Sequence, residues 1–139
     1  MEDRDGIERL VNTWAMEGVG AGRLEVFDQL LDPNVIDLSG GREARGSETF
    51  KARAAMVRDA FSQRTVTVDA LVVDGDRVAW RWTVRGVHSG AFGDVPATQK
   101  SIVLSGTNFQ RIRSGRVVEH WTLVDAAGLL RQIRPPASA

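Results

Sequence analysis

Residues 101–125 read SIVLSGTNFQRIRSGRVVEHWTLVD and decide the fold, because two apolar-rich runs flank a short polar turn. Runs rich in β-branched and aromatic residues on both sides of such a turn predict a β-hairpin. Gly115 can adopt a positive φ, so we expect a three-residue loop over 113–115 that ends in a left-handed glycine. This loop would pair Ile112 with Arg116.

The register of this hairpin assigns each side chain to a face. Counting back from the loop pairs Asn108 with His120 and Gly106 with Thr122. Side chains alternate along a strand and paired residues share a face. One face is expected to carry Gly106, Asn108, Gln110, Val118, His120 and Thr122. The other is expected to carry Ser105, Thr107, Phe109, Glu119, Trp121 and Leu123. The first face mixes polar and apolar groups, which is typical of a ligand pocket.

The composition argues against several classes of function. The chain has 139 residues, 42% of them hydrophobic, which predicts one globular domain. Its 18 basic and 18 acidic residues give no net charge, so nothing indicates nucleic acid or an anionic membrane as a partner. Without cysteine, and with two histidines far apart, no metal site is expected. The charged N-terminus and the lack of a long apolar run predict a cytoplasmic protein.

Hydrophobic periodicity predicts the order of the elements. Apolar residues over 7–15 recur with helical spacing, and Gly18, Gly20 and Gly22 are expected to end this first helix. Ser47 is a candidate cap for a later helix. The expected helices cover 7–15, 24–31, 50–61 and 126–133, and the expected strands cover 35–38, 65–73, 78–87 and both arms of the hairpin.

This order predicts an α+β domain, because the helices are segregated from a long antiparallel run of strands. A curved antiparallel or mixed sheet wrapped around the N-terminal helices would leave a cavity at its open end. We expect a single domain over residues 1–134 and a disordered tail over 135–139.

Several short motifs carry a family likeness. They are Gly86-Val-His88-Ser-Gly90, Glu119-His120-Trp121, and Gly128-Leu-Leu-Arg-Gln132. With these motifs the chain resembles the SnoaL-like polyketide cyclases of the nuclear transport factor 2 superfamily, over nearly its whole length. The resemblance implies a conical α+β barrel with an active site inside the cone that needs no cofactor.

The resemblance also implies roles for particular positions. The cyclases use an aspartate directly after the tryptophan of Glu-His-Trp as general acid/base, and Thr122 stands there in this chain. They can also carry a Gln and a His two residues apart on the preceding strand, where this chain has Gly106 and Asn108. The positions that match the family are Asp37, His88, His120 and Asp125.

His120 is the first candidate for chemistry, because imidazole both takes and gives a proton near neutral pH. Its expected neighbour Asn108 could orient the ring or hold a substrate carbonyl. The alternative is a hydrogen-bonded structural histidine. Asp37 is a second catalytic candidate, because burial would raise the pKa of a carboxyl in an apolar strand. Its alternative is a strand-end aspartate bonded to the turn at 39–40.

The remaining candidates have structural alternatives too. Asp125 either reaches the pocket mouth as a third catalytic residue or caps the helix that follows it. Trp14 and Trp82 either wall the cavity or pack in the core. His88 either contacts substrate or supports a strand end. The expected substrate-binding set is Trp14, Trp82, His88, Gly106, Asn108 and Thr122.

Two functions of different classes follow. The first is a cofactor-independent enzyme that binds an apolar, polyketide-like carbonyl compound and catalyses cyclisation, isomerisation or hydration/dehydration. The second is a binding or assembly module that uses the same cavity without turnover. On the opposite face of the hairpin, Phe109, Trp121 and Leu123 form an apolar patch that a monomer rarely leaves bare. We therefore expect a homodimer with Trp121 near the centre of its interface.

Overall fold

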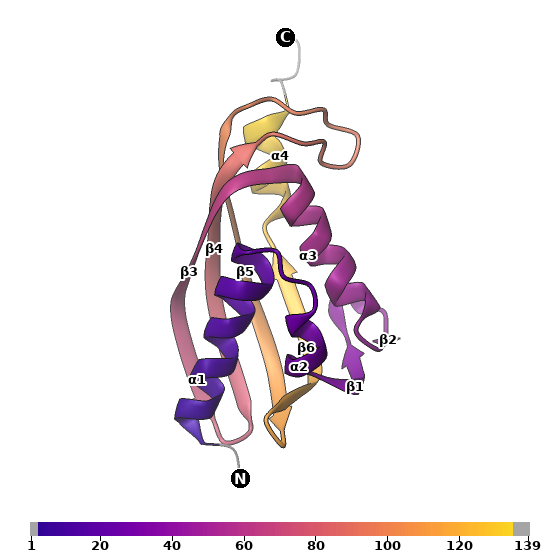
Figure 1. The fold of residues 1–139 in the computed structure, drawn as a ribbon, viewed down its shortest axis with the longest axis vertical. Helices are drawn as coiled ribbons and strands as arrows, with labels where there is room; N and C mark the ends of the chain where they lie inside the picture. The colour runs from indigo at the N-terminus through magenta and orange to yellow at the C-terminus, as the bar shows by residue number, and fades with distance from the viewer. Residues whose placement is uncertain (1–2, 135–139) are drawn as a thin grey trace.

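A six-stranded sheet positions every other element. In the computed structural model, which describes residues 3–134, the strands run in the order β2-β1-β6-β5-β4-β3 (Figure 1). Strand β1 is parallel to β6, and the other neighbouring pairs are antiparallel. The sheet curves but stays open, since β2 and β3 are its two edges in the described part of the chain. The strands are β1 Leu31–Asp37, β2 Ala44–Arg45, β3 Phe61–Asp74, β4 Arg77–His88, β5 Ser101–Arg113 and β6 Arg116–Val124.

The main helices lie against this sheet. Figure 1 shows α1 and α3 in front of the strands. The helices are α1 Arg4–Thr13, the π-helix η1 Trp14–Gly20, α2 Val26–Leu30, the 3-10 turn η2 Ser39–Gly41, α3 Glu48–Ala60 and α4 Ala126–Ile133. None of the described helices is long and apolar enough to cross a bilayer. The predicted α+β class is confirmed, and α4 has its predicted bounds. The predicted tail lies outside the described residues.

The first helix runs further than predicted. Gly18 and Gly20 do not end it, because the chain continues through both as the π-helix η1. Gly18 packs against the ring of Phe27, where an added Cβ would lie 2.8 Å from Cζ. The glycine at this position therefore permits close packing rather than a break.

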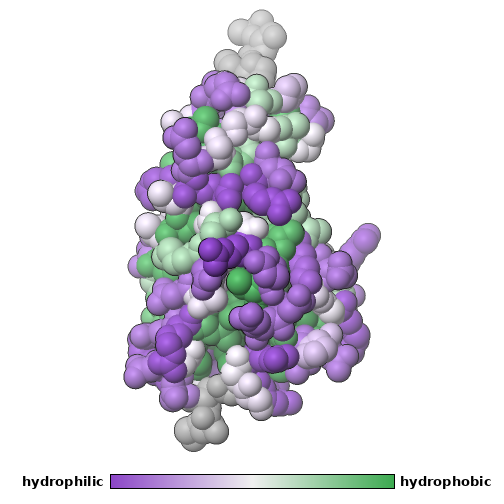
Figure 2. Space-filling model, in the orientation of Figure 1, coloured by the Kyte–Doolittle hydropathy of each residue, from purple (hydrophilic) through white to green (hydrophobic). Residues whose placement is uncertain are grey.

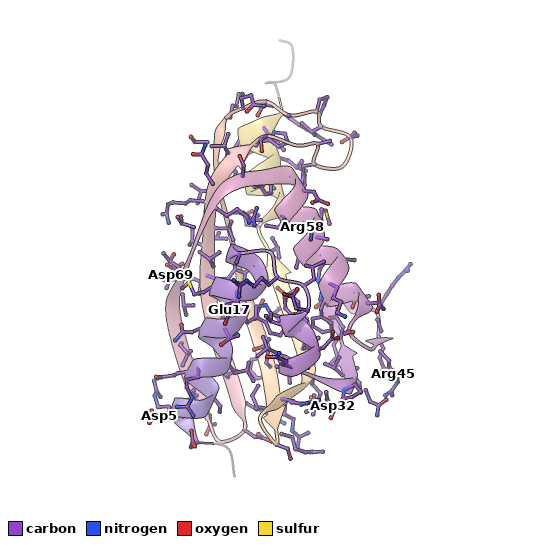
Figure 3. The ribbon with its side chains drawn as sticks, viewed as in Figure 1. Asp5, Glu17, Asp32, Arg45, Arg58 and Asp69 are labelled. Atoms are coloured by element: carbon purple, nitrogen blue, oxygen red, sulfur yellow. The ribbon has the colours of Figure 1, made fainter. Side chains whose placement is uncertain are left out.

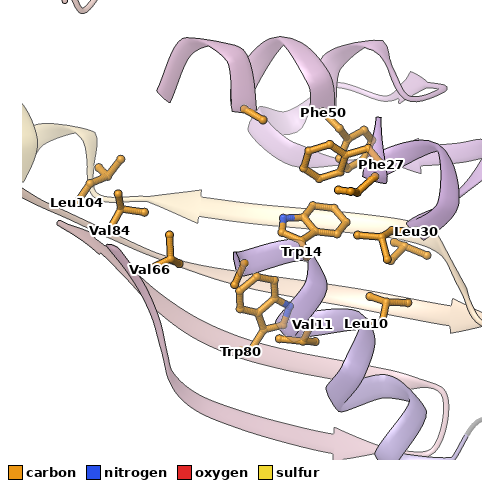
Figure 4. Close-up of a cluster of buried hydrophobic side chains, with 14 of the residues drawn as sticks. Leu10, Val11, Trp14, Phe27, Leu30, Phe50, Val66, Trp80, Val84 and Leu104 are labelled. Carbon is orange, nitrogen blue, oxygen red and sulfur yellow. The ribbon is translucent and has the colours of Figure 1, made fainter. Parts of the chain in front are cut away.

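Trp14, at the start of η1, is the centre of the core. Its ring meets those of Phe27, Phe50 and Trp80 edge-on, with centroids 5.0, 5.8 and 6.4 Å apart (Figure 4). Such pairs contribute about 0.5–1.5 kcal/mol each beyond the burial of their area. These contacts link η1, α2, α3 and the sheet through one side chain.

Polar groups cover much of the face of the molecule that lies in front of this core. Figure 2 shows hydrophilic residues over most of one face, with hydrophobic side chains visible between them. Asp5, Arg45 and Asp69, which are labelled in Figure 3, lie at the periphery and are exposed.

The β5–β6 hairpin closes through a two-residue turn, so the predicted three-residue loop is wrong. Ser114 and Gly115 have φ values of 53° and 75°, and Arg113 pairs with Arg116. Two consecutive positive φ values are typical of the turn whose twist suits a hairpin.

A bulge follows the turn. The pairing steps from Ile112–Val117 to Arg111–Glu119, which leaves Val118 as the extra residue. Val117 is fully buried, whereas Val118 is only half-buried. The prediction that Val118 faces the pocket is therefore wrong, and Val117 takes the inward position.

Beyond the bulge, Gln110 pairs with His120 and Asn108 pairs with Thr122. The predicted register, which pairs Asn108 with His120, is wrong by two residues. A shift of two keeps every side chain on its face, whereas a shift of one would exchange the faces. Asn108 and His120 are accordingly buried, while Trp121 on the opposite face is 40% exposed.

Two long side chains, Arg64 and Gln132, attach the end of η1 and the helix α4 to the sheet. Arg64 of β3 donates to the carbonyls of Val19 and Gly20 at distances of 3.1 and 3.0 Å, which fixes the end of η1. Gln132 of α4 both accepts from the backbone N–H of Val103 and donates to its carbonyl, each at 2.8 Å. This amide therefore pairs with β5 beyond the last paired residue of β6.

Any side chain larger than hydrogen at position 106 should clash with its neighbours. Gly106 pairs with Trp82, and an added Cβ would overlap the indole and approach the carbonyl oxygen of Leu123 to 2.9 Å. We expect Gly106→Ala to lower the free energy of unfolding by about 1–3 kcal/mol in urea titrations. The control is Gly75→Asn, because Gly75 has φ 60° and no atom within 4 Å of an added Cβ. Equal losses in the two variants would contradict the steric explanation.

Candidate active site

A small cavity lies between η1, α3 and the inner face of the sheet. Its volume is about 100 Å³, and aromatic and aliphatic side chains form most of its wall. Trp14 lines it from η1, and Trp80 and Trp82 line it from β4. Besides the indoles, the polar side chains that line it are Arg53, Asn108, His120 and Thr122.

One chain of hydrogen bonds crosses three strands beneath this cavity. The indole Nε1–H of Trp80 donates to Oε1 of Gln110 at 2.9 Å. Nε2 of Gln110 lies 3.0 Å from Nδ1 of His120. Gln110 is fully buried and His120 is 3% exposed, so neither bond competes with water.

The direction of these bonds fixes the proton on His120. An indole N–H can only donate, so Oε1 of Gln110 must accept and its NH₂ group must donate. The donor NH₂ makes Nδ1 of His120 an acceptor, and a neutral imidazole then carries its proton on Nε2. Nε2–H is thus left for the cavity that His120 lines.

A second, parallel chain lies two residues along the strands. Nε1–H of Trp82 donates to Oδ1 of Asn108 at 3.2 Å, and the hydroxyl of Thr122 donates to the same oxygen at 2.7 Å. Because Oδ1 accepts both bonds, the Asn108 NH₂ group is left as a donor. Asn108 also lines the cavity.

Aromatic rings and a nearby cation keep His120 neutral. Its ring stacks on Trp14 with centroids 5.2 Å apart and meets Phe50 edge-on at 4.9 Å. Burial, followed by the positive charge of Arg53, lowers the pKa of His120 to about 3, and the negative charge of Asp37 opposes this only in part. The imidazole is therefore neutral near physiological pH.

Asp37 is buried, and its carboxylate is bonded to groups other than the imidazole of His120, its register partner on β6. Within the described residues the carboxylate accepts from the backbone N–H of Ser39 at 3.0 Å and from the hydroxyl of Thr49 at 3.4 Å. Its Oδ2 lies 2.8 Å from Nη2 of Arg53. Burial raises the pKa of Asp37, but the bonds from Ser39 and the charge of Arg53 outweigh burial, so the pKa lies below its ordinary value. Asp37 is therefore an ionised partner of Arg53.

Arg53 connects Asp37 to the cavity. Its guanidinium lies over the ring of Phe50, 5.1 Å from the centroid, and its side chain is 38% exposed. Nη2 is close to Asp37 yet lacks a well-directed hydrogen bond there, so the contact is mainly electrostatic. Because Arg53 lines the cavity and its guanidinium has several N–H groups, it can donate a hydrogen bond to a ligand oxygen.

Besides Asp37, three predicted site residues lie away from the cavity wall. His88 is fully buried at the end of β4, where its Nδ1 accepts from the backbone N–H of Thr98 at 3.3 Å. Gly106 lies beneath Trp82. The carboxylate of Asp125 accepts from the backbone N–H of Gly128 at 2.9 Å and caps α4. The predicted residues that the structure brings together at the cavity are Trp14, Trp82, Asn108, His120 and Thr122.

Two residues of this site are missing from the sequence prediction. Gln110 is assigned to the pocket face but not to the site, although an amide facing an apolar core needs partners. Arg53 follows Phe50 by three residues, so both lie on one helix face and reach the same cavity. Helical spacing from an apolar anchor is the signal that could have identified Arg53.

The chain is similar to one protein family and to several solved structures. A family model described as SnoaL-like polyketide cyclase matches residues 9–133. Among solved structures, IdmH of Streptomyces antibioticus, a proposed polyketide cyclase, is 30% identical with a TM-score of 0.78, over 90% of this chain and 96% of that chain. TsrD of Streptomyces laurentii is 25% identical with a TM-score of 0.86, over 96% and 98% of the two chains.

A third structure shares the fold. A proposed SnoaL-like polyketide cyclase of Jannaschia sp. CCS1 is 23% identical with a TM-score of 0.83, over 98% of this chain and 100% of that chain. A comparison with curated protein sequences gives no match.

The lowered pKa of His120 should make the free energy of unfolding depend on pH. This pKa falls from 6.5 to about 3 on folding, so between these values the unfolded chain binds more protons than the folded chain. The contribution of His120 is complete above pH 6.5 and is lost as the pH falls, by about 1.4 kcal/mol for each pH unit. His120→Gln, which keeps an acceptor for Gln110, should remove this part of the slope.

Urea titrations between pH 6.5 and 3.8 test this expectation. Asp37 does not interfere, because its pKa is lowered from 3.8 and its contribution is lost only at lower pH. His88 is common to both proteins and cancels in the comparison. Equal slopes in wild type and variant would show that His120 titrates normally.

Proposed function

The chain belongs to the SnoaL-like polyketide cyclase family, and from this we propose that its cavity binds a flat, mainly apolar carbonyl compound and catalyses a proton transfer on it. The reaction is a cyclisation, isomerisation or hydration/dehydration that needs no cofactor. One observation carries this proposal: a neutral imidazole presents Nε2–H at an apolar cavity. Such a donor suits a carbonyl oxygen on which negative charge develops.

His120 is the proposed catalytic residue, as the acid partner of the substrate oxygen. The C–H bond beside the carbonyl breaks, its proton passes to water at the cavity mouth, and the electron pair moves onto the oxygen as an enolate. His120 and the NH₂ group of Asn108 stabilise that oxygen. Fixed donors in a poorly solvated site stabilise such charge more than water does.

The other residues are proposed to bind and orient the compound. The rings of Trp14 and Trp82 supply flat apolar walls. Arg53, held by Asp37, offers a cation to a second oxygen of the compound. Asp37 thus acts through Arg53, and Asp125, which caps a helix, has no proposed part in the chemistry.

A binding module without turnover is the second candidate function. It is favoured by Thr122, which replaces the family aspartate, because no carboxylate lines the cavity among the described residues. The cavity volume of about 100 Å³ also favours it. An apolar cavity that holds a benzene molecule measures about 150 Å³. A larger ligand must therefore protrude from the mouth or widen the cavity.

We also propose a homodimer formed through the outer face of the sheet. Val72, Ala79, Phe109 and Trp121 pair in one row across β3, β4, β5 and β6. The exposed fractions are 66% for Val72, 46% for Phe109, 40% for Trp121 and 64% for nearby Leu123. Salt bridges from Arg111 to Asp76 and Glu119 lie beside this row. A second copy of the same face would cover an apolar row with a polar margin.

The catalytic proposal predicts the effect of removing the imidazole. Benzoylacetone, a one-ring β-diketone, should exchange the hydrogen between its two carbonyl groups for deuterium faster with the protein than without it. His120→Phe keeps a ring against Trp14 but removes both nitrogens, and should reduce the acceleration about 10²–10⁴-fold. NMR measures the exchange rate.

Glu119→Gln is the matched control, because Glu119 precedes His120 on the opposite face of β6. It should leave the acceleration unchanged. Full acceleration in His120→Phe would remove His120 from the mechanism. Saturable binding of the diketone without faster exchange would favour the binding module.

The dimer proposal predicts the effect of a charge at Trp121. Trp121→Glu would set a carboxylate against apolar groups and against its own symmetry mate, and should raise the dissociation constant at least about 30-fold. Light scattering at micromolar concentration measures the mass. Met56→Glu is the control, since Met56 on α3 is 47% exposed outside the patch. A monomeric wild type, or dissociation of both variants alike, would contradict the proposed interface.

A further inference from the structure

We propose that Gln110 is a positioning residue that holds the proton of His120 on Nε2, so that the cavity offers hydrogen-bond donors and selects ligands through oxygen acceptors. Gln110 does not line the cavity, and its side chain bonds link Trp80 to His120. It can affect a ligand only through the imidazole. The choice of ligand rests on the proposed function, whereas the position of the proton does not.

The orientation of the Gln110 amide is determined from both sides. If the amide were reversed, its NH₂ group would face the N–H of Trp80, and two buried donors would oppose each other. The same reversal would turn the carbonyl oxygen toward Nδ1 of His120 and require a proton there. Because Trp80 is 2% exposed, no water can relieve its N–H. Trp80 therefore determines the orientation of the Gln110 amide, and this amide determines which nitrogen of His120 carries the proton.

The other polar groups of the cavity wall point to the same kind of ligand. Arg53 and the indole N–H of Trp14 can only donate. In Figure 4 the nitrogen of Trp14 faces the side where Val66, Val84 and Leu104 lie, and these residues line the cavity. Asn108 presents its NH₂ group, because its oxygen already accepts two bonds. The hydroxyl oxygen of Thr122 is the acceptor that remains among the lining side chains.

This arrangement favours a ketone over the matching alcohol. A carbonyl oxygen can accept from His120 and Asn108 at once, with no hydrogen left over. An alcohol of the same shape brings a hydroxyl hydrogen, which finds few acceptors in the cavity, and an unsatisfied buried donor weakens binding. The inference therefore specifies a ligand whose inserted end carries a ketone or enolate oxygen.

The first test observes the proton directly. Two-bond ¹H–¹⁵N correlation spectra of protein labelled in its two histidines distinguish the two neutral tautomers. We expect His120 to show the Nε2–H pattern at mildly alkaline pH. The signals of His120 are identified by their absence in His120→Gln, which leaves those of His88. An Nδ1–H pattern for His120 would overturn the proposal.

The second test reverses the chain of bonds. Gln110→Glu places an acceptor against both Trp80 and His120, so Nδ1 of His120 should gain a proton. Asn108→Asp makes the same change of charge in the parallel chain, where both existing partners already donate. It should leave the His120 tautomer unchanged. An unchanged tautomer in Gln110→Glu, or a switch in both variants, would contradict the role of Gln110.

A further variant covers the case in which Gln110→Glu does not fold. Trp80→Phe removes the N–H that orders the amide and keeps an aromatic ring in the core. His120 should then show a mixture of the two tautomers. A single Nε2–H tautomer in this variant would show that Trp80 and Gln110 do not set it.

The ligand test uses acetophenone and 1-phenylethanol, which match in size. NMR titration should show about tenfold tighter binding of the ketone to wild type. Gln110→Glu exposes a bare Nε2 to the cavity and should reverse the preference. Equal affinities in wild type would overturn the ligand class. If the protein shows the Nε2–H tautomer and prefers the ketone but does not accelerate the diketone exchange, this inference stands and the proposed catalysis is wrong.

Discussion

An indole N–H can donate a hydrogen bond but cannot accept one, and this property orders the polar side of the cavity. Trp80 and Trp82 each donate to an amide on β5, and each amide contacts its paired residue on β6. The first chain donates from β4 through β5 toward β6, whereas in the second chain Trp82 on β4 and Thr122 on β6 both donate to Asn108 on β5. By fixing the orientation of these two amides, Trp80 and Trp82 help to determine which ligand atoms the cavity wall can bind.

Apolar packing gives these bonds their electrostatic setting. Trp14 stacks on His120, and Phe50 closes the imidazole from another side. These rings exclude the water that would stabilise an imidazolium, and the cation of Arg53 disfavours it further. Asp37, which pairs with His120 in the register of β1 and β6, forms an ion pair with Arg53 and offsets part of the effect of that cation on the imidazole. The same side chains that stabilise the fold thus determine the ionisation of the candidate site.

The sequence predicts the fold better than it predicts the site. Helical and strand periodicities reflect burial, so α4 and the faces of the hairpin, apart from Val118 at the bulge, are predicted correctly. The turn is not, because Ser114 takes a positive φ that its residue type does not favour. The pairing of Asp37 with Arg53 depends on where α3 lies against β1, which local patterns do not contain. The tautomer of His120 is even harder to predict from local sequence patterns, since it depends on two hydrogen bonds across three strands.

The side chain of Gln132 affects whether another strand can pair with β5 beyond the end of β6. Beyond the end of β6, the backbone N–H and carbonyl of Val103 would be open to a strand from another molecule. The amide of Gln132 occupies both groups, as an adjacent strand would. Strand addition at this margin is therefore blocked from within the chain, and fibrillar growth by that route would first have to displace α4. At the proposed dimer face, by contrast, side chains rather than the backbone would form the contact.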